Sequence, residues 1–68
     1  MSIGQKIRRL RQVQQLTQEE LAQRSELTKG FISQVERDLT SPSVATFMDI
    51  LEALGVSPEA FFKDEEEM

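Results

Sequence analysis

The chain has 68 residues, enough for one small domain, and it contains neither cysteine nor histidine. These absences exclude disulfides and thiolate metal sites, and they remove the commonest catalytic base and metal ligand. We therefore expect no enzyme activity, no metal site and no cofactor. No apolar run approaches the roughly 18 residues of a membrane helix, and there is no signal-peptide pattern. A cytoplasmic helical protein without membrane contact is the expectation.

The net charge of −4 is unevenly distributed along the chain. Residues 1–37 carry seven Lys and Arg against four Glu, a net charge of +3. Residues 38–68 carry one Lys against eight acids, a net charge of −7. This asymmetry fits a basic contact face for nucleic acid backed by an acidic remainder. The plainer interpretation is a lopsided charge that serves solubility only.

The first predicted helix runs from Ile3 to about Gln14. Ser2 and Gln5 form a capping-box pattern at its start. Apolar residues then recur at helical spacing and are expected to face inward: Ile3, Ile7, Leu10 and Val13. The opposite, solvated face is expected to carry Lys6, Arg8, Arg9, Gln12 and Gln15.

A second capping box, Thr17 with Glu20, starts a short helix that ends near Arg24. Ser25-Glu26-Leu27 forms a turn, and Thr28 is an N-cap for a third helix that runs to about Arg37.

A loop with Pro42 precedes a fourth helix from about Ser43, which ends at the cap glycine Gly55. Its apolar face is expected to comprise Val44, Phe47, Met48, Leu51 and Leu54. Ser57-Pro58-Glu59 starts a short fifth helix that Ala60-Phe61-Phe62 completes. The predicted fold is therefore all-α, a compact five-helix domain over residues 1–63. An acidic tail follows over residues 64–68 and resembles the start of a linker.

The stretch from Thr17 to Arg37 has the properties of a helix–turn–helix. It combines a short first helix, a small residue at the crossing (Ala22), a tight turn and a second helix with an exposed polar row. A merely solvated helix face is the alternative for that row. The pattern as a whole favours binding of double-stranded DNA.

Several segments together resemble the XRE family, the DNA-binding domains of the lambda-repressor and Cro type. The segments are Leu16-Thr17-Gln18, Glu20-Leu21-Ala22, Ile32-Ser33-Gln34-Val35-Glu36-Arg37 and Ser41-Pro42-Ser43. The resemblance covers about residues 3–62. It is greatest to the N-terminal domain of bacterial transcriptional regulators in which a cupin sensor domain follows, a domain that this chain does not include.

The resemblance implies a role in transcription regulation, such as that of a repressor, with the recognition helix, about residues 28–37, in the major groove. It implies base contacts by Thr28, Lys29, Gly30, Ser33 and Gln34. It implies phosphate contacts by Gln18, Arg37, Thr40 and Ser43. It also implies an ion pair between Arg11 and Glu36. Two copies are expected to bind a palindromic operator as a homodimer, with helix five and the end of helix four, including Phe61 and Phe62, as the subunit contact.

Three residues depart from local rules. Glu26 replaces the glycine common in such turns and is expected to adopt a left-handed conformation. Gly30 weakens the recognition helix by about 1 kcal/mol relative to alanine. Asp38 places an acid beside the expected phosphate path. This acid and the net charge of −4 keep a second interpretation open, a protein-interaction module of the same fold, of the antitoxin or anti-repressor type.

Overall fold

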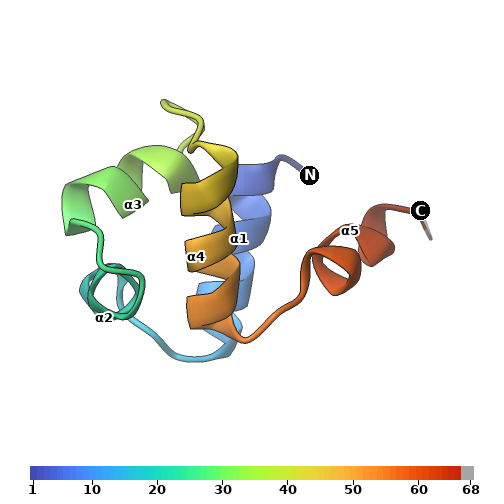
Figure 1. Cartoon of the computed structure of the whole chain (residues 1–68), viewed down its shortest axis with the longest axis horizontal. Helices are drawn as coiled ribbons and strands as arrows, with labels where there is room; N and C mark the ends of the chain where they lie inside the picture. Colours follow the sequence, from blue (N-terminus) through green and yellow to red (C-terminus); the bar gives the residue numbers. More distant parts are fainter. Residues whose placement is uncertain (67–68) are drawn as a thin grey trace.

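This computed structural model describes residues 1–66. Within them the chain forms five helices joined by short turns and loops, and no strands. The helices are α1 Ile3–Val13, α2 Gln18–Arg24, α3 Lys29–Glu36, α4 Val44–Leu54 and α5 Pro58–Glu66. The helices α2 and α3 lie at one end of the molecule, α5 lies at the other, and α1 and α4 stand between them (Figure 1). The all-α, five-helix prediction is confirmed.

Hydroxyl side chains start every helix. Ser2, Thr17, Thr28 and Ser43 each accept a hydrogen bond from the backbone N–H three residues later, and Ser57 does the same for α5. The two predicted capping boxes are both present, at α1 and α2. At α2, hydrogen bonds from the Thr17 backbone N–H and hydroxyl hold the pKa of Glu20 below its ordinary value. These local signals explain why the predicted starts of α1 to α4 are nearly correct.

The first four helices all end in the same way. One residue adopts a left-handed conformation, and the next donates its N–H to a carbonyl five residues earlier, which is the Schellman motif. The left-handed residues are Gln15 (φ 60°), Glu26 (φ 59°), Asp38 (φ 59°) and Gly55 (φ 71°). The donors are Leu16, Leu27, Leu39 and Val56, at 3.0, 2.8, 2.9 and 3.0 Å. The left-handed conformation expected at Glu26 is therefore present.

The core lies between α1, α4 and the α2–α3 pair, and α5 contributes one side chain to it. Its members are Ile7, Leu16, Leu21, Ala22, Ile32, Val35, Ile50, Leu51, Leu54 and Phe61. Phe61 meets the rings of Phe47 and Phe62 edge-on, at centroid distances of 5.3 and 5.1 Å. This aromatic group joins α5 to α4.

The apolar periodicity of α1 and α4 overestimates their buried faces. Ile3 and Val13 are 43% and 73% exposed, and Val44 and Met48 are 79% and 42% exposed. These residues lie at helix ends or at the border of the apolar face, where the other described helices leave them partly or largely uncovered. Ile50, which was not expected inside, is fully buried.

The expected position of Lys6 was also wrong, because Lys6 was predicted on a solvated face with Arg8 and Arg9. Both arginines are exposed, but Lys6 is only 6% exposed. Its ammonium lies 4.9 Å from the centroid of the Phe61 ring, a cation–π arrangement, and it has no hydrogen-bond partner among the described side chains.

The fifth helix is longer than expected. It continues through Glu66, so the predicted acidic tail over residues 64–68 begins inside a helix, and residues 67–68 lie outside the described part. No helix within residues 1–66 is long and apolar enough to cross a membrane.

Candidate nucleic-acid interface

The turn between α2 and α3 is held by its own side chains. The Ser25 hydroxyl is buried and donates to the Leu21 carbonyl at 2.7 Å. Leu27 packs against the core, and the left-handed Glu26 reverses the chain between them. Thr28 then caps α3 by accepting from the Phe31 N–H at 3.1 Å. The two helices are thereby fixed in the arrangement of a helix–turn–helix.

The outer surface of α3 is polar and has no internal partners. Lys29, Gly30, Gln34 and Arg37 are exposed, and Ser33 is half-buried. In the described part of the chain, no hydrogen bond or ion pair involves the side chain of Lys29, Ser33, Gln34 or Arg37. Three of the five predicted base-contact residues, Lys29, Ser33 and Gln34, therefore present side-chain groups that are free to bind another molecule, as does Arg37.

The fifth predicted base contact, Thr28, is partly engaged. Its hydroxyl oxygen accepts the capping hydrogen bond, and its hydroxyl hydrogen remains available as a donor.

Gly30 has no packing role within the described residues. A Cβ atom built on it meets nothing within 4 Å. The protein therefore has a helix-weakening residue at an exposed position without an internal reason for it.

The acid at the end of α3 is neutralised by Arg11 and is also hydrogen-bonded by Gln18. Arg11 Nε and Nη2 donate to the Glu36 carboxylate at 2.7 and 3.0 Å, so the expected ion pair is present. Arg11 Nη1 also donates to the Leu16 carbonyl at 2.8 Å. Gln18 Nε2 donates to Glu36 at 3.1 Å, so Gln18 contacts α3 directly. The network ties α3 to both α1 and α2 and leaves no free carboxylate at Glu36.

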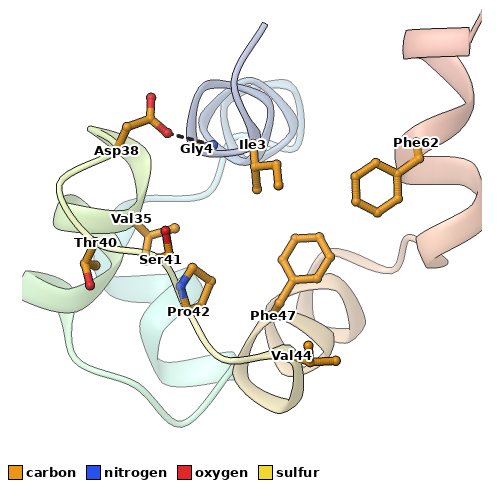
Figure 2. Close-up of a pocket in the computed structure, with 10 residues that line it drawn as sticks. All are labelled: Ile3, Gly4, Val35, Asp38, Thr40, Ser41, Pro42, Val44, Phe47 and Phe62. Atoms are coloured by element: carbon orange, nitrogen blue, oxygen red, sulfur yellow. Dashed lines mark hydrogen bonds between the residues drawn. The ribbon is translucent and has the colours of Figure 1, made fainter.

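Asp38 is the second acid near this surface, and it has a structural role. Its carboxylate accepts a hydrogen bond from the Ser2 hydroxyl at 2.6 Å. It also accepts one from the Gly4 N–H at 3.3 Å, which Figure 2 shows. The negative charge thus lies at the N-terminus of α1, where the helix dipole favours it. Gly4 permits this approach, because a Cβ there would lie 2.6 Å from the Asp38 carboxylate and closer still to the Val35 carbonyl.

The remaining predicted phosphate contacts lie after α3. Thr40 is half-buried at the edge of a hollow. Ser43 is exposed, but its hydroxyl caps α4 and bonds to the Thr46 hydroxyl at 3.0 Å. Of the four residues assigned to phosphates, only Arg37 has a side chain that is both exposed and free of hydrogen bonds among the described residues.

A hollow of about 240 Å³ opens between α1, α4, α5 and the loop after α3. Ile3, Phe47 and Phe62 point into it from three helices, and Val44 stands at its edge (Figure 2). Phe62 is 37% exposed, whereas Phe61 is only 1% exposed and has almost no surface to offer a second subunit. The sequence pattern did not identify Ile3 and Val44 as surface residues. Apolar periodicity identifies one face of a helix but does not show whether another element covers it.

The helix α5 is remote from the α3 surface. The segment α1 to α3 carries the predicted basic excess, and α5 lies at the opposite end of the long axis (Figure 1). No group of three or more Asp or Glu that could hold a metal ion occurs among the described residues.

Comparisons with known proteins agree with this geometry. The helix-turn-helix family model HTH_3 matches residues 7–61. The immunity repressor protein of Bacillus phage phi105 is 34% identical over 65 residues, which cover 96% of this chain and 45% of that protein. The HTH-type transcriptional regulator PuuR of Escherichia coli is 36% identical over 63 residues, which cover 93% of this chain and 34% of that protein. The chain thus spans between a third and a half of the length of these relatives.

Solved structures are similar over most of the chain. The restriction-modification controller protein C.AhdI from Aeromonas hydrophila has a TM-score of 0.83 at 34% identity, covering 87% of this chain and 89% of that one. An HTH_3 family transcriptional regulator from Vibrio cholerae has a TM-score of 0.87 at 31% identity, covering 96% of this chain and 36% of that one. The chain therefore belongs to the HTH_3 (XRE) helix-turn-helix family of DNA-binding transcriptional regulators, which is not a family of enzymes.

Proposed function

We propose that this domain binds double-stranded DNA sequence-specifically, with α3 in the major groove. The observation that carries the proposal is the row Lys29, Gly30, Ser33 and Gln34 on α3. It has no partners among the described residues, yet α3 is anchored rigidly to α1 and α2. Rigid placement of exposed polar groups is what readout of base edges requires.

Each side chain in the row has a distinct role in this proposal. Lys29 donates to guanine acceptors or to a phosphate, and Gln34 pairs bidentately with adenine. Ser33 and Thr28 add less selective hydrogen bonds. Gly30 lets the helix backbone approach the bases closely. This role explains why a glycine stands at a position where the protein itself leaves space for a side chain.

Four other residues fix the position of the domain on the phosphates in this proposal. Arg37 supplies a free guanidinium at the end of α3. Gln18 has a second amide hydrogen that its bond to Glu36 does not use, and that hydrogen is assigned to a phosphate. Thr40 and Ser43 lie on the adjoining loop, where Ser43 must release its bond to Thr46 to donate outward.

The proposal includes a homodimer on a palindromic operator, with half-sites about 34 Å apart. A single copy buries too little surface for tight specific binding. The proposed subunit contact is the exposed apolar face around the hollow, formed by Ile3, Val44 and Phe62. Phe61 supports this face from within the core rather than contacting the partner.

Selection from a random duplex library tests the proposal directly. Enrichment of a two-fold symmetric motif is the expected result. Lys29→Ala or Gln34→Ala should relax one position of the motif by about 1–3 kcal/mol, whereas Arg37→Ala should weaken all sequences alike. Gln12→Ala, which removes an exposed amide from α1, is the matched control and should leave the motif unchanged. An unaltered motif with Gln34→Ala would contradict the docking.

The subunit contact has a separate test. Val44→Glu should give a folded monomer in sedimentation equilibrium, because Val44 borders the hollow and is 79% exposed. Dimers that persist in this variant would contradict the assigned face.

The net charge of −4 favours one competing function, binding to another protein through the same fold. Retention on mixed genomic DNA separates the two functions. A DNA-binding domain is retained at low salt and released as salt rises, whereas a protein-binding module is not retained.

A further inference from the structure

One of the four similar helix ends differs from the others. In a Schellman motif, the apolar residue that follows the left-handed position usually packs back onto its own helix. Leu16 is 8% exposed and part of the core, and Leu27 and Val56 pack against that core. Leu39, which occupies the same position after α3, is 62% exposed and lies outside the core cluster.

The backbone that carries Leu39 is fixed. Its N–H donates to the Gln34 carbonyl at 2.9 Å. The preceding residue, Asp38, is bonded through its carboxylate to Ser2 and Gly4. The backbone at Leu39 is therefore tied both to α3, through the Gln34 carbonyl, and to the start of α1, through Asp38.

The surroundings of Leu39 belong to the proposed DNA interface. Arg37 and Thr40, which flank it closely in sequence, are assigned to phosphates, and Gln34, to which it is hydrogen-bonded, is assigned to a base. The 38–43 loop projects from the helical body beside the end of α3 (Figure 1). An exposed apolar side chain at this place has one apolar counterpart in the major groove, the C5-methyl group of thymine.

We infer that Leu39 is a specificity residue that packs on a thymine methyl group beside the base read by Gln34. This inference rests on the proposed function and adds an apolar contact to an interface that is otherwise polar. Burial of the methyl group favours thymine over bases that lack it. The hydrogen bonds of Asp38 hold the loop in place, so that Leu39 meets the base at one position.

Replacement of thymine by deoxyuridine removes only the methyl group and so tests the contact directly. The enriched operator duplex is synthesised with deoxyuridine at one thymine at a time, and binding is measured for the wild-type chain and for Leu39→Ala. The wild-type chain should lose about 4-fold in affinity at one thymine, the value expected for burial of a single methyl group. Leu39→Ala should bind the unmodified operator more weakly and should be insensitive to deoxyuridine at that position.

Val13→Ala is the matched control. Val13 is an apolar residue on α1 that is 73% exposed and belongs to none of the proposed DNA or subunit contacts. It should show the wild-type response to deoxyuridine, and thermal melts should show that both variants are folded.

The failures are distinguishable. If the wild-type chain enriches no motif, both the proposed function and this inference are wrong. If a motif is enriched but Leu39→Ala keeps the wild-type sensitivity to deoxyuridine, only the inference is overturned. Weaker binding by Leu39→Ala without any deoxyuridine effect in the wild-type chain also overturns it, because the leucine then contacts the sugar–phosphate backbone.

Discussion

Arg11 and Glu36 form a bidentate ion pair between α1 and the last residue of α3. The two N–H···O distances are 2.7 and 3.0 Å, and the side chains are 11% and 1% exposed. The planar guanidinium matches the carboxylate in a way that a lysine ammonium does not. This pair positions α3 and removes a negative charge from the surface that faces DNA in our proposal.

Arg11→Ala should lower the free energy of unfolding by about 3–5 kcal/mol, because it leaves the buried Glu36 carboxylate with only Gln18 as a side-chain partner. Urea denaturation measures the change. Arg9→Ala removes an exposed arginine from the same helix and should change stability by less than about 0.5 kcal/mol. Equal effects of the two variants would mean that the ion pair contributes nothing.

Glu26→Gly should stabilise the domain by about 1 kcal/mol, because glycine adopts the left-handed conformation at φ 59° without a steric penalty. The expected rise in melting temperature is about 4–8 °C for a domain of this size. Glu26→Ala is the control, since it removes the carboxylate but keeps the Cβ atom, and it should give no such rise. A melting temperature that is unchanged or lower in the glycine variant would contradict this account.

Gly4→Ala should destabilise the domain by about 2 kcal/mol or more, because the new Cβ overlaps the Val35 carbonyl and the Asp38 carboxylate. Chemical denaturation measures the loss. Crowding predicts that Gly4→Ser is at least as harmful as Gly4→Ala. Wild-type stability of the alanine variant would mean that α1 and α3 separate at no cost.

Gly30→Ala should change stability and binding in opposite directions. Alanine raises helix stability by about 0.5–1 kcal/mol, and no described atom obstructs its Cβ. The same methyl group should weaken DNA binding, because it separates the helix backbone from the bases. Thermal melts and binding titrations on one preparation measure both effects. A more stable variant with undiminished affinity would remove the proposed role of Gly30.

Local sequence determined most of the fold. Capping hydroxyls such as Ser2, Thr17 and Thr28 act over three residues, so their patterns identify helix starts without knowledge of the rest of the chain. The left-handed turn at Glu26 was predictable from its place in the helix–turn–helix pattern, where glycine is common. The polar row on α3 and its capped start were sufficient to indicate a helix–turn–helix.

Only the tertiary structure decided which apolar and charged residues are covered. Val44 and Phe61 both belong to helical apolar patterns, yet one is 79% exposed and the other 1% exposed. Lys6 is buried because α5 lies over it.

Asp38 has its role because the chain brings it to Ser2, 36 residues away in sequence. Helical periodicity is a property of one element, whereas burial and long-range hydrogen bonds depend on which other elements pack against it. The sequence by itself therefore predicted the five helices and indicated the polar surface of α3, and packing determined how that surface is anchored and which apolar residues remain exposed.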